Sequence, residues 1–143
     1  MTPAAEVRTR EFVIGDYDQA VALWKAEEGI EVCEGDSREE ISDYLQRNPG
    51  LSRVAEAGCK IVGAVLCGHD GRRGMIYHLA VAPEYRGRGV GKMLIDDCVR
   101  GLREAGLPRA IILVAGDNSA GHEFWLRNGF EDLAFAIAMT REL

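Results

Sequence analysis

The residues best suited to chemistry lie between Ile76 and Lys92, where an apolar run leads into a loop with glycine at alternate positions. These glycines are Gly87, Gly89 and Gly91. Glycine adopts positive φ without strain and lets a ligand approach the backbone closely. If a helix begins at this loop, its free amide groups and its dipole favour a phosphate group. The segment therefore predicts a diphosphate-binding turn between a strand and a helix.

Basic side chains add positive charge to this loop, at Arg86, Arg88 and Lys92, but two familiar phosphate-binding patterns do not fit it. A Walker A loop needs glycine where Arg86 stands and serine or threonine where Met93 stands. The dinucleotide-binding fingerprint G-x-G-x-x-G would need a third glycine at position 92 if it began at Gly87, and at position 94 if it began at Gly89. Lys92 and Leu94 stand at these positions. The other interpretation is a glycine-rich turn without a ligand. Three glycines at a helix start cost stability without improving packing, so we favour a ligand.

The segment resembles motif A of the GCN5-related N-acetyltransferase (GNAT) family, in which the pattern L-x-V-x-P precedes R-x-x-G-x-G. These patterns fall at residues 79–83 and 86–91. Downstream, Asn118, Phe124 and the pair Gly129-Phe130 resemble the next motif of the family. The expected order of elements and the length also agree, so the resemblance covers most of the chain.

This resemblance implies an enzyme that moves the acetyl group of acetyl-CoA to a primary amine by direct attack in a ternary complex. The amine would belong to a small molecule or a peptide, and no metal would be needed. A bulge would splay the strand from the next parallel strand, and the thioester would lie in the resulting cleft. The strand would pair with the pantetheine arm, and the loop amides would hold the pyrophosphate. The implied cofactor-binding residues are Leu79, Ala80, Val81, Arg86, Gly87, Arg88, Gly89, Val90, Gly91, Lys92, Asn118 and Trp125.

Such a reaction needs a base, because an alkylammonium group has a pKa of about 10.4 and is almost wholly protonated at pH 7. A general base can accept the proton directly or through water. Negative charge then develops on the thioester oxygen, where a backbone N–H of residues 79–81 can stabilise it. Holding both reactants in line supplies most of the remaining acceleration.

The acid is less obvious, because Trp125 stands where many family members carry a tyrosine that protonates the leaving thiolate. An indole N–H donates a hydrogen bond but does not transfer a proton usefully. Tyr77 and His78 are the candidate catalytic residues, and a histidine titrates near neutral pH. In a regular strand Tyr77 shares a face with Leu79 and Val81, whereas His78 points the other way unless a bulge rotates it. The alternative for each is a packed residue of a central strand.

Acidic residues crowd the connection between the first two expected helices. One interpretation is an anionic lip that attracts a cationic amine, and the other is a solvated acidic loop. If the lip matters, neutralising two of its members, Glu31 and Glu34, should raise the acceptor KM without changing coenzyme binding. The acidic residues are Glu27, Glu28, Glu31, Glu34 and Asp36.

Two other functions fit part of the pattern. A coenzyme A-binding regulatory domain without catalysis is the main alternative, and Trp125 favours it. An interaction module that pairs its sheet with a partner would not need a glycine loop flanked by arginines. The resemblance also allows a homodimer. A net charge of −6 argues against binding to nucleic acid or anionic membranes.

Apolar periodicity and turn residues place these motifs in an α/β domain. We expect a GNAT-like mixed, mostly antiparallel sheet with a central splayed parallel strand pair and helices on both faces. Residues 75–82 and 110–115 would form that parallel pair, and Ser37 and Glu40 have the spacing of a capping box. Strands are expected at residues 7–14, 51–57, 60–68, 75–82, 110–115 and 133–140, and helices at residues 17–27, 37–48, 89–105 and 118–128.

Length and composition fit a single N-acetyltransferase domain spanning residues 1–143, with 47% hydrophobic and 28% charged residues. The 4 cysteines are scattered without a C-x-x-C pair, so we expect neither a zinc site nor a disulfide framework. The first residues lack the apolar core of a signal peptide, and no stretch reaches the roughly 18 apolar residues of a membrane span. We therefore expect a cytoplasmic protein.

Overall fold

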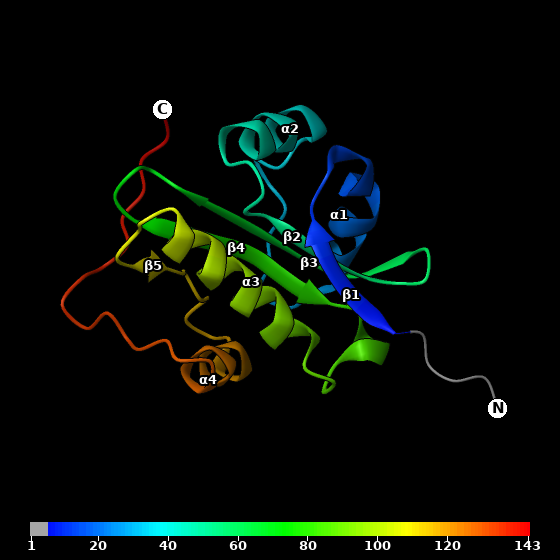
Figure 1. Cartoon of the computed structure of the whole chain (residues 1–143). Coiled ribbons are helices and arrows are strands. Elements are labelled where there is room, and N and C mark those ends of the chain that lie inside the picture. Colours follow the sequence, from blue (N-terminus) through cyan, green and yellow to red (C-terminus); the bar gives the residue numbers. More distant parts are fainter. Residues whose placement is uncertain (1–5) are drawn as a thin grey trace.

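A computed structural model describes residues 6–143 and shows one mixed sheet with the strand order β1-β2-β3-β4-β5 (Figure 1). The first four strands pair antiparallel with their neighbours, and β5 is parallel to β4. These pairings confirm the α/β fold class and the mixed, mostly antiparallel sheet. The strands are β1 (Val7–Glu11), β2 (Arg53–Ala57), β3 (Lys60–His69), β4 (Gly74–Val81) and β5 (Ala110–Ile111).

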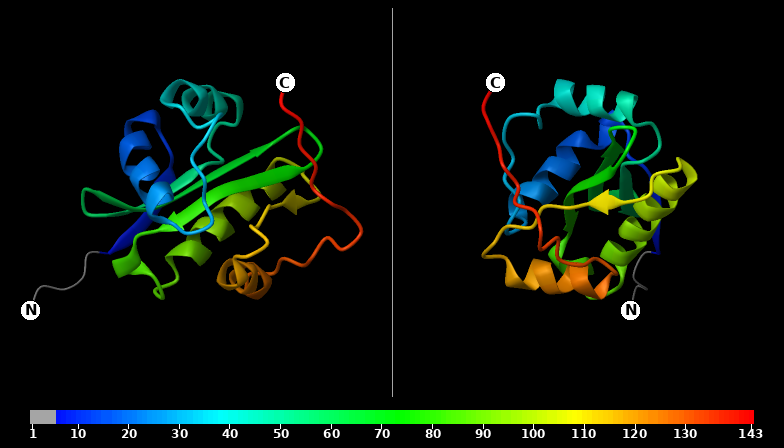
Figure 2. Two further views of the ribbon diagram at one scale, coloured as in Figure 1. Left: turned by 180° about the vertical axis from the view of Figure 1, so that it is seen from behind. Right: turned by 90° about the vertical axis from the view of Figure 1, so that its left-hand side faces the viewer.

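Helices cover both faces of the sheet, and Figure 2 shows the two layers, with α1 and α2 on one face and α3 and α4 on the other. Along the part of the chain that the structure describes, no helix combines the length and the apolar character needed to cross a membrane. The helices are α1 (Tyr17–Ala26), α2 (Arg38–Arg47), α3 (Val90–Glu104) and α4 (Ser119–Arg127), with short 3-10 helices at Ile14–Asp16 and Pro83–Tyr85.

Strand β3 separates two apolar cores, because its run from Ile61 to Cys67 is buried on both faces. On one face, Leu66 packs in a cluster with Trp24 of α1. On the other, Val65 packs in a cluster with Leu94 of α3. The continuous apolar sequence of β3 is what this double burial requires.

Helix α2 begins with the expected capping box. The Ser37 hydroxyl oxygen accepts a hydrogen bond from the Glu40 N–H at 3.1 Å, and Glu40 Oε1 accepts one from the Ser37 N–H at 3.3 Å. The helix ends at Arg47, before Pro49. The box fixes the end of the segment between the first two helices, residues 27–37, which we call the α1–α2 connection.

The extent of the last two predicted strands is wrong, whereas the other four agree to within a few residues. The ladder between β4 and β5 ends at Met75 and Ile111, so only the start of predicted strand 110–115 forms. Predicted strand 133–140 does not form and contains a turn instead, in which the Ala136 N–H donates to the Leu133 carbonyl. Because the β4–β5 ladder is so short, β5 offers no regular edge on which a further strand can pair. The apolar side chains of this segment are exposed, notably Phe135, Ile137 and Met139.

An ion pair joins β1 to the start of α1. The two terminal nitrogens of Arg10 donate to the two carboxylate oxygens of Asp16 at 2.8 and 2.9 Å. The Val13 N–H donates to the same carboxylate at 3.0 Å, and Arg10 Nε also donates to Glu56 of β2 at 3.1 Å. Although burial raises it, the hydrogen bonds from Arg10 and Val13 hold the pKa of Asp16 below its usual value. The pair fixes the direction in which α1 leaves the sheet.

We predict that Asp16→Asn lowers the free energy of unfolding at pH 7 by about 2 kcal/mol, because hydrogen bonds to charged groups contribute about 1.5–3 kcal/mol. A carboxyl group whose pKa is depressed by folding stabilises the protein above its unfolded pKa, near 3.9, and this stabilisation is lost as the pH falls. The difference between wild type and variant should therefore shrink below about pH 4. Urea unfolding at both pH values measures it.

The control for this prediction is Asp18→Asn, because the Asp18 side chain is 90% exposed on the same helix. Its replacement should change the free energy of unfolding by less than about 0.5 kcal/mol. Equal losses in the two variants would contradict the assigned role of Asp16.

Candidate active site

Strand β4 carries a β-bulge where it passes the middle of β3. Ala80 pairs with Ala64 and Tyr77 pairs with Leu66, so three steps along β4 match two along β3. The irregularity falls at His78, whose φ is 54°. Among the described residues, His78 alone has a positive φ without being glycine. Such a backbone is strained and persists where the surrounding structure holds it, often at functional sites.

The bulge brings Tyr77 and His78 to the same face of the sheet. Leu66, the partner of Tyr77, belongs to the core under α1, and His78 contacts Trp24 of α1. Leu79, by contrast, packs against the core under α3. The expectation that Tyr77 shares a face with Leu79 is therefore wrong, because the extra residue resets the alternation of side chains. His78 lies opposite Leu79, as it would in a regular strand, so the residue whose face the bulge changes is Tyr77.

His78 is held between a carboxylate and an indole. Its Nε2 lies 2.8 Å from Asp36 Oδ2, and its ring centroid lies 5.1 Å from that of Trp24. The side chains of His78 and Asp36 are 20% and 10% exposed. The imidazole is thus oriented from two sides and still reachable from solvent, as a residue that exchanges protons with a substrate must be.

Tyr77 lies next to His78 on this face and is 37% exposed. Burial raises the pKa of its phenol, so the phenol keeps its proton at neutral pH. A neutral phenol can donate one hydrogen bond and accept others. The two predicted catalytic residues therefore lie together, on the face that α1 covers.

The edge of β4 that faces β5 is open along most of its length. Of the residues described, only 74 and 75 of β4 pair with β5. The Ala82 N–H donates to the Val62 carbonyl of β3 at 2.8 Å, so alternation turns the backbone groups of Val81 and Leu79 toward the open edge. An unpaired strand edge can accept an extended ligand as a further strand. Of the three strand residues predicted to pair with the pantetheine arm, Leu79 and Val81 present their backbone groups on this edge, whereas Ala80 turns its groups toward β3.

The glycine-rich loop forms the expected turn from a strand to a helix. Gly87 and Gly89 have φ values of 74° and 80°, which other residues rarely adopt. No side chain caps the start of α3, and the Met93 N–H donates to the Gly89 carbonyl. This is the first intrahelical hydrogen bond of α3, so the N–H groups of residues 89–92 have no acceptor within the helix. They lie at the positive end of the helix dipole. This arrangement suits a phosphate group.

Arg86 is tied to two groups outside the glycine-rich loop. One terminal nitrogen pairs with Glu27 Oε2 at 2.6 Å, and Nε donates to the Val81 carbonyl at 3.2 Å. The guanidinium therefore joins the end of α1 to the open edge of β4. The other two basic residues of the loop, Arg88 and Lys92, are exposed.

Helix α4 packs directly against the start of α3. A Cβ atom on Gly91 would lie 3.0 Å from the ring of Phe124, so glycine allows this close approach. Trp125 stacks edge to face with Phe124 and Phe130, at centroid distances of 5.6 and 5.0 Å. Trp125 is thus a half-buried member of an aromatic cluster at the base of α4.

Asn118 lies between the start of α4 and the α1–α2 connection. Its side-chain oxygen caps α4 by accepting a hydrogen bond from the Gly121 N–H at 3.0 Å. Its side-chain nitrogen lies 2.7 Å from the position that a Cβ atom on Gly29 would occupy. The α1–α2 connection therefore passes directly over a residue predicted to contact the pantetheine arm.

The acidic residues of the α1–α2 connection fall into two groups. Glu27 and Asp36, near its two ends, are paired with the glycine-rich loop and with the β4 bulge. Sequence reasoning treated all five carboxylates as one group, either an anionic lip or a solvated loop, and missed the contact between Asp36 and His78, which are 42 residues apart. The exposed members are Glu28, Glu31 and Glu34.

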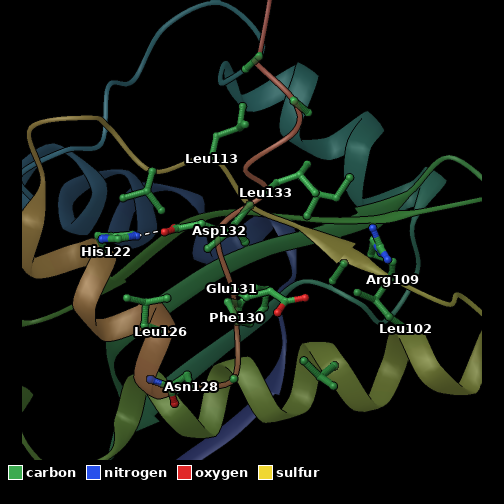
Figure 3. A pocket seen from close by; sticks show the side chains of 18 of the residues that line it. Leu102, Arg109, Leu113, His122, Leu126, Asn128, Phe130, Glu131, Asp132 and Leu133 are labelled. Atoms are coloured by element: carbon green, nitrogen blue, oxygen red, sulfur yellow. Dashed lines mark hydrogen bonds and ion pairs between the residues drawn. The ribbon is translucent and has the colours of Figure 1, made fainter.

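A separate apolar cavity of about 780 Å³ lies between α3, β5, α4 and residues 128–138 (Figure 3). His122 and Asp132 pair beside it at 2.6 Å, and His122 is exposed. His69 accepts a hydrogen bond from the Gly71 N–H in a turn. None of the described residues predicted for catalysis or cofactor binding lines this cavity.

Known proteins resemble this chain in sequence and in fold. Residues 17–130 match the acetyltransferase (GNAT) family. An acetyltransferase of Sodalis glossinidius is 35% identical over 111 residues, which cover 78% of each chain. Among solved structures, Ard1 of Thermoplasma volcanium has a TM-score of 0.78 at 22% identity, over 87% of this chain and 82% of that one. The PaiA N-acetyltransferase of Thermoplasma acidophilum, in complex with coenzyme A, has a TM-score of 0.77 at 22% identity, over 88% and 90%.

The two solved structures share the fold of this chain. The family match extends over most of the chain, from α1 to the end of the aromatic cluster. This chain is an acetyltransferase enzyme and belongs to the acetyltransferase (GNAT) family.

Proposed function

We propose that the chain is an N-acetyltransferase that moves the acetyl group of acetyl-CoA to a primary amine in a ternary complex. The amine belongs to a small molecule or a peptide. The observation that carries this proposal is the β4 bulge, beside which the open strand edge runs toward the glycine-rich loop. Tyr77 and His78 lie at the same bulge, facing α1.

The donor lies along the open edge of β4 in this proposal. Backbone groups of residues 79–81 pair with its pantetheine arm, and the free amides of residues 89–92 hold its pyrophosphate. Cβ atoms on Gly87 and Gly89 would meet no heavy atom within 4 Å beyond their chain neighbours, so no other part of the chain covers the loop at these positions. Other predicted contacts come from the basic loop residues and from α4, namely Arg86, Arg88, Lys92, Asn118 and Trp125.

In the proposed reaction, the amine nitrogen attacks the thioester carbon. The N–C bond forms, the C–S bond breaks, and its electron pair leaves on sulfur. His78 accepts the proton of the amine, since a neutral imidazole has a free lone pair and this one is held on the face that α1 covers. A backbone N–H of residues 79–81 stabilises the charge on the thioester oxygen.

The proposed partner of the leaving sulfur is Tyr77, whose phenol keeps its proton at neutral pH. Trp125 does not suit this role, because its ring is packed between Phe124 and Phe130 and an indole is not a useful acid. The second candidate function, coenzyme A binding without catalysis, is favoured by the same packed Trp125. Thiol release from acetyl-CoA with a panel of amines tests both functions. Saturable binding without thiol release would support the regulatory domain.

We predict that Gly89→Ala raises the Kd for acetyl-CoA about tenfold, because a left-handed backbone costs an alanine about 1–2 kcal/mol and the loop must shift. Calorimetry or a thermal shift with acetyl-CoA measures this. Gly71→Ala is the control, since Gly71 has a φ of 91° in a turn between β3 and β4. It should lower the melting temperature similarly and leave the Kd unchanged. A similar loss of affinity in both variants would contradict a binding role for the loop.

We predict that His78→Gln lowers kcat for acetyl transfer at least 100-fold, because general bases contribute about 10²–10⁴-fold. The Kd for acetyl-CoA should change less than about twofold, since the donor contacts β4 through its backbone. His122→Gln, on the exposed histidine of α4, should retain full activity. An active His78→Gln enzyme would remove His78 from the mechanism.

We predict that Glu31→Gln combined with Glu34→Gln raises the KM for a cationic amine several-fold at low salt, because exposed carboxylates attract cations. The difference should fade at high ionic strength, and the KM for acetyl-CoA should not change. The charge-matched control is Glu104→Gln with Glu142→Gln, both exposed. Unchanged kinetics in the first variant would identify the connection as a solvated loop.

A further inference from the structure

Asp36 is turned inward from the α1–α2 connection, unlike its acidic neighbours. Its side chain is 10% exposed, and its Oδ2 lies 2.8 Å from Nε2 of His78. Glu31 and Glu34, which share the connection, are exposed. A carboxylate that is buried against an imidazole has a different role from one that contributes only to a surface potential.

The carboxylate of Asp36 is fixed by the turn in which it lies. The Cys33 N–H donates to Asp36 Oδ2 at 3.3 Å, and the Asp36 N–H donates to the Cys33 carbonyl at 3.1 Å. The Tyr17 hydroxyl donates to the Asp36 carbonyl at 2.5 Å. The next residue, Ser37, caps α2. The turn at Cys33 and the Tyr17 side chain of α1 therefore hold Asp36 in place.

The imidazole of His78 is fixed from the other side. The positive φ of the bulge sets the direction in which its side chain leaves β4. The ring then packs on Trp24, whose side chain is fully buried. With both partners held, the contact between Nε2 and the carboxylate is part of the fold and not a chance encounter of two mobile side chains.

A carboxylate beside Nε2 determines which ring nitrogen carries the proton. A neutral imidazole has one N–H and one lone pair, and an ionised carboxylate only accepts hydrogen bonds. The proton therefore lies on Nε2, where Asp36 accepts it, and the lone pair lies on Nδ1. We propose that Asp36 is a positioning residue that holds His78 in the Nε2–H tautomer, so that Nδ1 accepts the proton of the acceptor amine.

This inference rests on the proposed function, in which His78 is the base. The proton moves from the amine nitrogen to Nδ1 as the N–C bond forms and the C–S bond breaks. The resulting imidazolium donates from Nε2 to Asp36, whose negative charge stabilises it. The proton on Nδ1 then passes to solvent, which restores the neutral ring for the next turnover. The thiolate takes its proton from Tyr77, and the phenolate regains one from solvent.

The first test is kinetic and uses Asp36→Asn and Asp36→Glu in the full chain. Asp36→Asn should lower kcat about 100-fold, because the tautomer is no longer set. The KM for acetyl-CoA should stay the same, and Asp36→Glu should recover part of the lost kcat. Ser37→Ala is the matched control for a purely structural effect, since it removes the α2 cap but leaves the carboxylate. It should lower the melting temperature and retain kcat.

The second test reads the tautomer without turnover. Long-range ¹H–¹⁵N correlation spectra distinguish the protonated from the unprotonated ring nitrogen of a neutral histidine. His78→Gln identifies the His78 signals among those of the 3 histidines. The wild-type ring should be in the Nε2–H form, and Asp36→Asn should give a mixed or reversed population.

The outcomes separate this inference from the proposed function. A wild-type Nδ1–H tautomer, or a folded Asp36→Asn enzyme with wild-type kcat, would overturn the positioning role even if acetyl transfer is intact. Absence of acetyl transfer in the wild-type protein would overturn the proposed function, and the inference about the base with it. The shift of tautomer in Asp36→Asn together with the selective loss of kcat would support both.

Discussion

A β-strand alternates its side chains with a period of two, and β4 departs from that rule at one residue. The bulge at His78 sends Tyr77 and His78 to the face under α1, after which Leu79 returns to the side of α3. The positive φ of His78 is unfavourable by itself. Packing on Trp24 and the hydrogen bond to Asp36 offset it. The site therefore depends on a strained backbone that α1 and the α1–α2 connection stabilise.

Strand β4 contributes to the site through its side chains and, separately, through its backbone edge. Its side chains near the bulge face the α1–α2 connection, and its backbone edge faces the gap that opens where the β4–β5 ladder ends. The ion pair between Arg10 and Asp16 contributes indirectly, because it fixes the start of the helix that carries Trp24. The same fold therefore places the side chains of Tyr77 and His78 on the face under α1 and leaves the backbone edge of β4 open beyond the short β4–β5 ladder (Figure 1).

Local patterns in the sequence predicted the parts of this structure that local physics determines. The capping box of Ser37 and Glu40, the glycine-rich turn before α3 and the order of the first five strands follow from residue type and spacing. The face of Tyr77 did not follow, because a bulge of one residue leaves no mark in an apolar run. The pairing of Asp36 with His78 joins positions 42 residues apart, so no spacing rule connects them. The C-terminal segment has the composition of a strand, but composition does not supply a partner edge.

The α1–α2 connection is anchored at both ends, through Glu27 to Arg86 and through Asp36 to His78. Between these anchors, most of residues 28–35 are exposed, and loops of this kind accept substitution at little cost in stability. Evolution can therefore change the charge and shape of this stretch while the glycine-rich loop and the β4 bulge keep their partners. Under the proposed function, a new acceptor preference would require substitutions in this short surface segment alone, and the scaffold beneath it would remain the same.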